Sequence, residues 1–190
     1  FRTSAAFRSY LDDLFGTVLY FDTTKRGNEH TLLLNVETVN DQYLANSNVL
    51  QEVLELIHTV IFKPNLENDV FIPSIVEREK EMVLERIHSI FDDKARYAQH
   101  RLMQILRPNH PASISANGTI DTVKAVTPAS LKAAYDSMLQ NDTVDIYVVG
   151  DINVEEVTEK LRQVLPFTDR ELHEKKQQVE VDIKPEEYTK

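Results

Sequence analysis

The chain has 190 residues, of which 42% are hydrophobic, and this is enough to bury a core as one globular unit. Its 21 Lys and Arg residues against 31 Asp and Glu residues give a formal net charge of −10, which repels nucleic-acid phosphates and anionic membrane surfaces. Cysteine is absent, so disulfides, thiolate ligands and thiol nucleophiles are excluded, and any metal site must use His, Asp or Glu. We therefore expect neither a nucleic-acid nor a membrane partner.

The sequence offers no targeting or membrane-spanning segment. No apolar run approaches the roughly 20 residues that cross a bilayer, and residues 1–15 lack the layout of a signal peptide. We expect a soluble protein in the cytoplasm, a reducing compartment that fits the lack of cysteine. The chain opens on Phe1 at an expected helix start, so we also expect that the natural N-terminus lies upstream.

The first elements predicted are a helix and a β-hairpin. Thr3 or Ser4 can cap a helix that Gly16 terminates. Residues 17–24 and 31–38 are rich in β-branched and aromatic residues and flank a polar segment over 25–30. This composition predicts two antiparallel strands joined by a longer loop.

Three helices are predicted next, over 42–62, 74–90 and 94–106. The first ends before Pro64, because proline disfavours helical geometry in the residue that precedes it. Helical spacing marks the residues expected to face inward in the first two helices, which are Leu50, Val53, Leu54, Ile57 and Ile61, and then Ile75, Val76, Met82, Val83, Ile87 and Ile90.

The last third begins with a loop over 107–126, which contains a short helical turn at 120–123. Thr127 then caps a helix that runs to 139, residues 145–149 form a short buried strand, and Asn153 caps a helix that ends at 165. We expect 168–190 to be a linker with a strand at 179–183. The order of elements predicts an α+β fold, an antiparallel sheet packed with helices, whose remaining strands lie upstream.

Several short strings resemble the N-terminal half-domain of the insulinase and processing-peptidase (M16-type) family of zinc metallopeptidases. They include Leu14-Phe15-Gly16 after the first helix, the charged helix from Ile75 to Leu84, His110-Pro111, and Val148-Val149-Gly150-Asp151. The match extends over most of 1–165. It implies that residues 1–167 are part of such a half-domain, and that 168–190 lead toward a second one.

The resemblance also implies where a zinc ligand would stand. Active members hold zinc with an inverted His-x-x-Glu-His helix, which is absent here and would precede residue 1, and with a Glu seven residues after another retained Glu. Aligned on Val76 to Glu79, the family's earlier glutamate falls on Glu79 and the ligand on Arg86. A guanidinium has no lone pair to donate and stays charged, so Arg86 would repel zinc. Glu85 could replace it only after a one-residue slip of register.

The closest pattern is a bacterial subgroup of this family that lacks the zinc motif. The resemblance therefore implies a pseudo-enzyme with no cofactor and no catalytic residue of its own. It would pair as a dimer with a related active subunit, or with a second half-domain, and help to enclose a peptide substrate. The alternative is an active zinc endopeptidase whose His-x-x-Glu-His motif lies upstream.

A second alternative is a metal-binding helical protein. Glu55 with His58 and Glu85 with His88 have the Glu-x-x-His spacing of carboxylate-bridged di-iron bundles, but the remaining helices lack the two further glutamates that such a site needs. The plainer interpretation is a half-buried His58 and a solvated Glu85 and His88. By similar reasoning, we expect His110 to be a turn residue, and Asn117-Gly118 lacks the glycine-rich context of a phosphate site.

Overall fold

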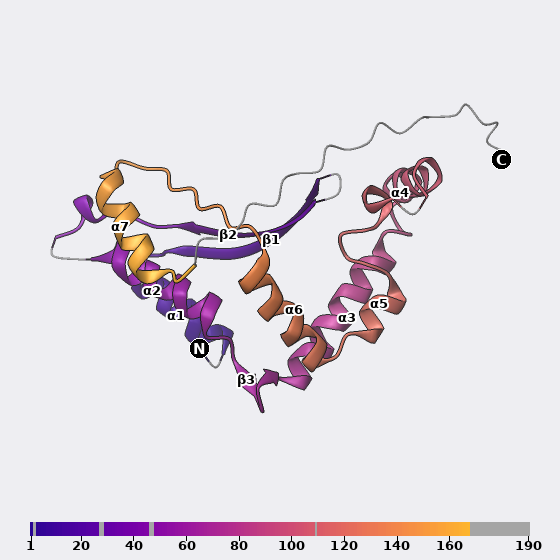
Figure 1. Ribbon diagram of the computed structural model, residues 1–190, viewed down its shortest axis with the longest axis horizontal. Coiled ribbons are helices and arrows are strands. Elements are labelled where there is room, and N and C mark those ends of the chain that lie inside the picture. Colours follow the sequence, from indigo (N-terminus) through magenta and orange to yellow (C-terminus); the bar gives the residue numbers. More distant parts are fainter. Residues whose placement is uncertain (2, 27–28, 46–47, 109, 168–190) are drawn as a thin grey trace.

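The structure is a computed structural model that describes residues 1, 3–26, 29–45, 48–108 and 110–167. The described residues form an α+β fold, as predicted, in which helices pack on a small antiparallel sheet (Figure 1). The expected linker over 168–190, with its strand at 179–183, lies outside the described residues. No helix of the described part is both long and apolar enough to cross a membrane.

Helix α1 (Ser4–Asp13) begins and ends at the predicted signals. The hydroxyl of Thr3 accepts a hydrogen bond from the Ala6 N–H at 3.1 Å, and Gly16 has a φ of 71° that suits a residue without a side chain. The chain then turns into the sheet at Thr17, whose buried hydroxyl donates to the Leu14 carbonyl at 2.7 Å. This corner places the first strand against α1.

Strands β1 (Val18–Arg26) and β2 (Glu29–Glu37) form the predicted antiparallel hairpin. The pairing runs from Val18 opposite Glu37 to Arg26 opposite Glu29, so the loop is shorter than the predicted 25–30 segment. Period-two alternation puts Leu19, Phe21, Leu34 and Val36 on one face of the hairpin. Leu19 and Val36 reach the hydrophobic core, whereas Phe21 is half exposed.

The core lies between α1, the hairpin and helix α2 (Val49–Phe62), with Leu14, Val49, Val53 and Leu56 buried at its centre. The predicted end of α2 is confirmed, since the helix stops one residue before the Lys63-Pro64 pair. Its predicted start at 42 is wrong. The short 3₁₀ helix η1 (Asp41–Tyr43) comes first, and Asp41 is used to cap α2 instead of joining it.

A second, very short hairpin follows α2 and was not predicted. Strands β3 (Leu66–Glu67) and β4 (Val70–Phe71) are joined by Asn68 and Asp69, which both have positive φ. Asn and Asp tolerate this conformation better than other residues and are typical of two-residue hairpin turns. The turn directs the chain from α2 into the next group of helices.

Helices α3 (Pro73–Ser89), α4 (Lys94–Leu106), α5 (Ile120–Ala125) and α6 (Pro128–Asn141) confirm the predicted elements, with the short helix η2 (Pro111–Ser113) between α4 and α5. They project from the core as an arm, which Figure 1 shows on the opposite side of the molecule from α1 and α7. On α3 only Val76 is buried, and the predictions for Ile75 and Met82 are wrong because both are more than a third exposed. The other helices of the arm leave these two side chains exposed.

The predicted buried strand over 145–149 is also wrong. The segment is extended, but it pairs with no strand that the structure describes, and its side chains are exposed. After it, Asn153 caps helix α7 (Val154–Val164) by accepting from the Glu156 N–H at 2.9 Å, as predicted. Helix α7 packs on α2 and buries Val157, and its C-cap residue Leu165 is buried as well.

Candidate functional site

Helix α3 carries Glu79 and Arg86, which the family resemblance aligns with a retained glutamate and with a zinc ligand. Glu79 and Arg86 are seven residues apart, so a regular helix places them two turns apart and within about 20° of each other around its axis. Both side chains are exposed. Glu85 lies about 180° around the axis from the buried Val76, on the side that faces away from the protein. Glu79 and Arg86 therefore share one flank, which Glu85 does not.

The other charges of α3 make ordinary surface pairs. Glu79 Oε1 accepts from Arg78 at 3.0 Å, and Lys80 Nζ donates to Glu77 Oε1 at 3.0 Å. The Lys80 side chain is largely covered, while the other three remain half exposed or more. Such pairs contribute at most about 1 kcal/mol each, so they give the helix a solvated charged face rather than a reactive centre.

The residues of the di-iron alternative do not come together. His58 is half-buried on α2 with its ring centroid 5.2 Å from that of Phe62, whereas Glu85 and His88 are exposed on α3. Glu55 is exposed and accepts from Gln51 Nε2 at 3.0 Å. Across the described ranges, no group of three His, Asp or Glu side chains is placed to hold a metal ion. The plainer interpretation of both Glu-x-x-His strings is the one that fits this geometry.

The loop that holds His110 is built as a set of turns. The His110 carbonyl accepts from the Ser113 N–H at 2.9 Å and from the Ser113 hydroxyl at 2.7 Å. Gly118, with a φ of 73°, ends the loop, and Thr119 then caps α5. His110 has the turn role that the sequence suggested, and Asn117-Gly118 serves as the approach to a helix.

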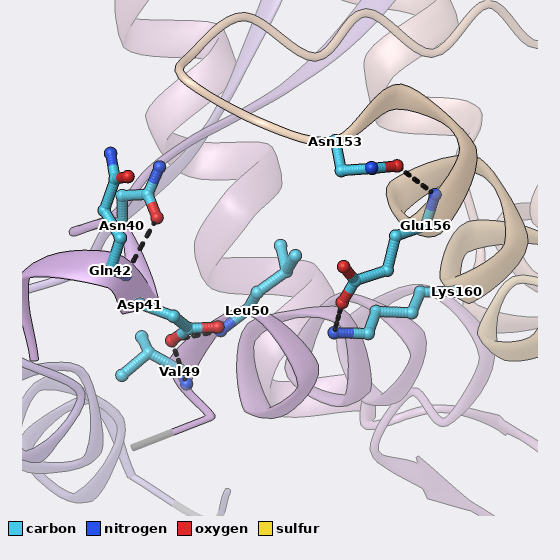
Figure 2. A network of polar contacts seen from close by, with 8 residues as sticks. All are labelled: Asn40, Asp41, Gln42, Val49, Leu50, Asn153, Glu156 and Lys160. Carbon is cyan, nitrogen blue, oxygen red and sulfur yellow. Dashed lines mark hydrogen bonds and ion pairs between the residues drawn. The ribbon is translucent and has the colours of Figure 1, made fainter. Parts of the chain in front are cut away.

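A polar network that the sequence did not reveal connects the segment before α2 with the loop before α7. Asp41 accepts from the Val49 N–H at 2.6 Å and so caps α2 from eight residues away (Figure 2). Its neighbours reach the loop before α7, where Asn40 Nδ2 donates to the Asp151 carbonyl at 2.5 Å and Gln42 Nε2 to Asp151 Oδ2 at 2.9 Å. No local pattern signals contacts between residues about 110 positions apart, so sequence reasoning missed them.

Tyr135 joins the arm to the core. Its hydroxyl donates to the Ile61 carbonyl near the end of α2, and its ring meets Phe71 of β4 edge-on at 5.5 Å. Burial, and to a smaller degree the charge of Asp136, raise the pKa of Tyr135 above its ordinary value. The side chain is thus a neutral donor at ordinary pH, and its role is to hold α6 against α2.

No family model matches the chain, but comparison with known proteins finds relatives both among curated proteins and among solved structures. A Bacillus subtilis (strain 168) protein named "Probable inactive metalloprotease YmfF" is 36% identical over 170 residues. Among the solved structures, a conserved protein from Enterococcus faecalis V583 is 34% identical, with a TM-score of 0.83. These matches cover 89% and 88% of this chain, but only 40% of each relative. The chain therefore spans about two fifths of the length of each of these relatives, and the Bacillus subtilis relative is named a probable inactive metalloprotease.

Proposed function

We propose that this chain belongs to a non-catalytic M16-type peptidase homologue, which acts as the partner or substrate-chamber subunit of an active zinc peptidase in the cytoplasm. The main observation behind this proposal is the position of Arg86, which lies two helical turns after Glu79 on the same flank of α3. Where the family resemblance expects a carboxylate ligand, this flank presents a permanent positive charge. The name of the Bacillus subtilis relative, "Probable inactive metalloprotease YmfF", supports the non-catalytic part of the proposal.

The donor chemistry of this flank does not fit zinc. Protein ligands of zinc are His nitrogen, Cys sulfur or carboxylate oxygen, and the guanidinium of Arg86 offers none of these. Glu85 would have to turn by about 100° to take its place, which would rotate Val83 and Ile87 away from the side that α3 buries. In this proposal, α3 supplies no zinc ligand at the position of Arg86 and takes no part in metal-dependent catalysis.

Metal content tests the first half of the proposal. The full-length protein is purified without chelators, its zinc and iron are measured by mass spectrometry, and hydrolysis of mixed peptides is assayed. We expect far less than one metal ion per chain and no hydrolysis above background. One zinc per chain with peptide cleavage would instead establish the active endopeptidase, and one or two irons the metal-binding helical protein.

Two matched variants identify the ligand if zinc is found. Glu85→Gln and Glu81→Gln remove one exposed carboxylate each from the same helix. Loss of zinc in Glu85→Gln alone would show that Glu85 is a ligand, and the assignment of Arg86 to that position would then be wrong. Equal zinc in both variants would place the metal elsewhere on the protein.

Association with an active homologue tests the second half of the proposal, which is the partner role. The protein is mixed with the related zinc peptidase of the same organism, and the complex is followed by analytical ultracentrifugation and by the peptidase rate. We expect a defined heterodimer and a changed rate of cleavage of long peptides. A peptidase that stays separate and equally active at tens of micromolar of both proteins would contradict the partner role.

A further inference from the structure

A hollow that no described residue fills lies at the C-terminal end of α2, where α1, β1 and the segment after α2 meet. Its volume is about 310 Å³. Sites that bind small molecules have volumes of about 300–1,000 Å³, so the hollow can take a small ligand or one residue of a larger one. The apolar side chains that line it are Phe7 of α1, Leu19 and Phe21 of β1, Val60 of α2, and Pro64.

The hollow continues the hydrophobic core toward the surface. Phe7, Leu19 and Val60 also pack against the buried core cluster. Phe21 is half exposed, so the hollow opens to solvent at its outer end. Side chains that border unfilled space lack the contacts they would make in a packed interior, and an apolar ligand would supply those contacts. The hollow therefore favours an apolar group.

Phe1 forms a fixed wall of the hollow. Its ring lies edge-on to that of Phe7, with the centroids 5.1 Å apart, and 5.0 Å from the ring of Tyr10. Its carbonyl accepts a hydrogen bond from Asn65 Nδ2 at 2.7 Å, beside the segment that follows α2 (Figure 1). Phe1 is thus held from both sides, and a wall that is already in place binds a ligand without the cost of ordering it.

Two polar groups stand at the α2 end of the hollow. Lys63, the C-cap of α2, has the one charged side chain among the described lining residues, and it is exposed. It forms no ion pair with any residue that the structure describes. The Val60 carbonyl lacks the donor that a helix supplies four residues later, because Pro64 has no N–H. Helix carbonyls point toward the C-terminus, so this acceptor faces the end where Lys63 lies.

An apolar hollow beside a cation and a carbonyl acceptor matches one ligand chemistry. A carboxylate pairs with the ammonium of Lys63 through charge-assisted hydrogen bonds, and an N–H donates to the Val60 carbonyl. An apolar side chain between these two groups enters the hollow. The last residue of a peptide carries all three features on neighbouring atoms, whereas a fatty acid has the carboxylate and the apolar chain but no N–H.

We propose that this hollow is a binding site for the C-terminal residue of a peptide whose last side chain is apolar. The side chain lies among Phe7, Leu19 and Phe21, and the carboxylate lies at Lys63. Capture of a C-terminal carboxylate is a recurring mode of peptide recognition. The inference goes beyond the proposed function, because it concerns a surface other than α3 and requires neither zinc nor a partner subunit.

Binding of labelled peptides to the full-length protein tests this site. The probe is the fluorescein-labelled pentapeptide Gly-Ser-Gly-Ser-Phe, followed by fluorescence anisotropy, and the comparison peptides carry a C-terminal amide or end in serine. We expect the probe to bind with a dissociation constant below about 1 mM, and both comparison peptides to bind at least about tenfold more weakly. Equal binding of the acid and the amide, or no binding of the probe, would overturn the proposal.

Two matched variants locate the carboxylate. Lys63→Gln removes the charge at the hollow, and Lys94→Gln removes an exposed charge at the start of α4. We expect Lys63→Gln to weaken the acid peptide about tenfold and to leave the amide unchanged, since only the acid uses the ammonium, while Lys94→Gln changes neither. Equal weakening of both peptides in Lys63→Gln would indicate a structural role, and no weakening would place the carboxylate elsewhere. Either result overturns the proposal.

Displacement of the probe by small acids distinguishes a peptide from other carboxylic acids. N-acetylphenylalanine keeps the ring, the carboxylate and the N–H, hydrocinnamic acid lacks the N–H, and decanoic acid represents a fatty acid. We expect N-acetylphenylalanine to displace the probe at concentrations at least about threefold lower than the other two, because only it can bond the Val60 carbonyl. Better displacement by decanoic or hydrocinnamic acid would overturn the assignment to a peptide.

Discussion

The core region and the arm are stabilised in different ways. Helix α2 alone contributes four buried residues, whereas α4 and α6 contribute none and α3 and α5 one each. The arm's helices instead begin at strong local signals, such as the capping boxes of Thr119 with Thr122 and Thr127 with Ser130. Packing holds the first region together, while the second depends on local hydrogen bonds and on a few contacts with its neighbours.

Truncation of a core leucine should give the largest effect. Leu56 is 2% exposed at the centre of the core, so Leu56→Ala should lower the free energy of unfolding by about 2–5 kcal/mol. Leu102→Ala makes the same chemical change on α4, where the side chain is 52% exposed, and should cost less than about 0.5 kcal/mol. Urea unfolding of both variants measures the difference. Equal losses would mean that α4 is covered in the full-length protein and that the arm is not open.

Loss of a helix cap should lower the free energy of unfolding by an intermediate amount, which should be similar in the core region and in the arm. Asp41→Ala removes the acceptor for the first N–H groups of α2, and Thr127→Ala removes the cap of α6. Each should cost about 1–2 kcal/mol, since capping bonds act locally whatever the packing. Asp41→Asn keeps an acceptor oxygen but removes the charge at the helix N-terminus, so it should cost less than Asp41→Ala. Urea midpoints rank the three variants, and a negligible loss in Asp41→Ala would show that water replaces the cap.

The same contrast explains how far the sequence alone predicts the structure. Helix ends at Thr3, Thr127 and Asn153 were predicted because capping depends on residues three positions away. The start of α2 was missed because its cap, Asp41, acts from across a turn. The burial predicted for Ile75, Met82 and 145–149 was wrong because hydrophobic spacing indicates which side a residue faces, not whether another element covers that side.

The candidate site was predictable only as a pattern. Glu79 and Arg86 lie on one flank because helix geometry is regular, and this followed from their seven-residue spacing. Their relation to zinc comes from the family resemblance and stays a prediction. The contacts of Asp151 with Asn40 and Gln42, and that of Tyr135 with Ile61, join distant segments, so no local sequence rule contains them.

Removal of the hydrogen bond from Tyr135 to Ile61 should have the smallest effect on stability, and this effect should depend on pH in a characteristic way. Tyr135→Phe removes one partly buried hydrogen bond between arm and core, which is worth about 1 kcal/mol at neutral pH. Because burial raises the pKa of Tyr135 above 10.0, the unfolded chain loses this proton at a lower pH than the folded protein. The resulting stabilisation is fully present below pH 10 and declines as the pH rises toward the folded-state pKa.

Phenylalanine has no such proton, so the stability gap between the wild type and Tyr135→Phe should narrow above pH 10. Urea unfolding of both proteins at pH 7 and at pH 10.5 measures the gap. Tyr43→Phe is the control at pH 7, where it should leave the midpoint unchanged because the Tyr43 side chain is exposed. A gap that widens at the higher pH would mean that the ionised form of Tyr135 is the one bound in the fold. The neutral hydroxyl would then not be the group that holds the arm to the core.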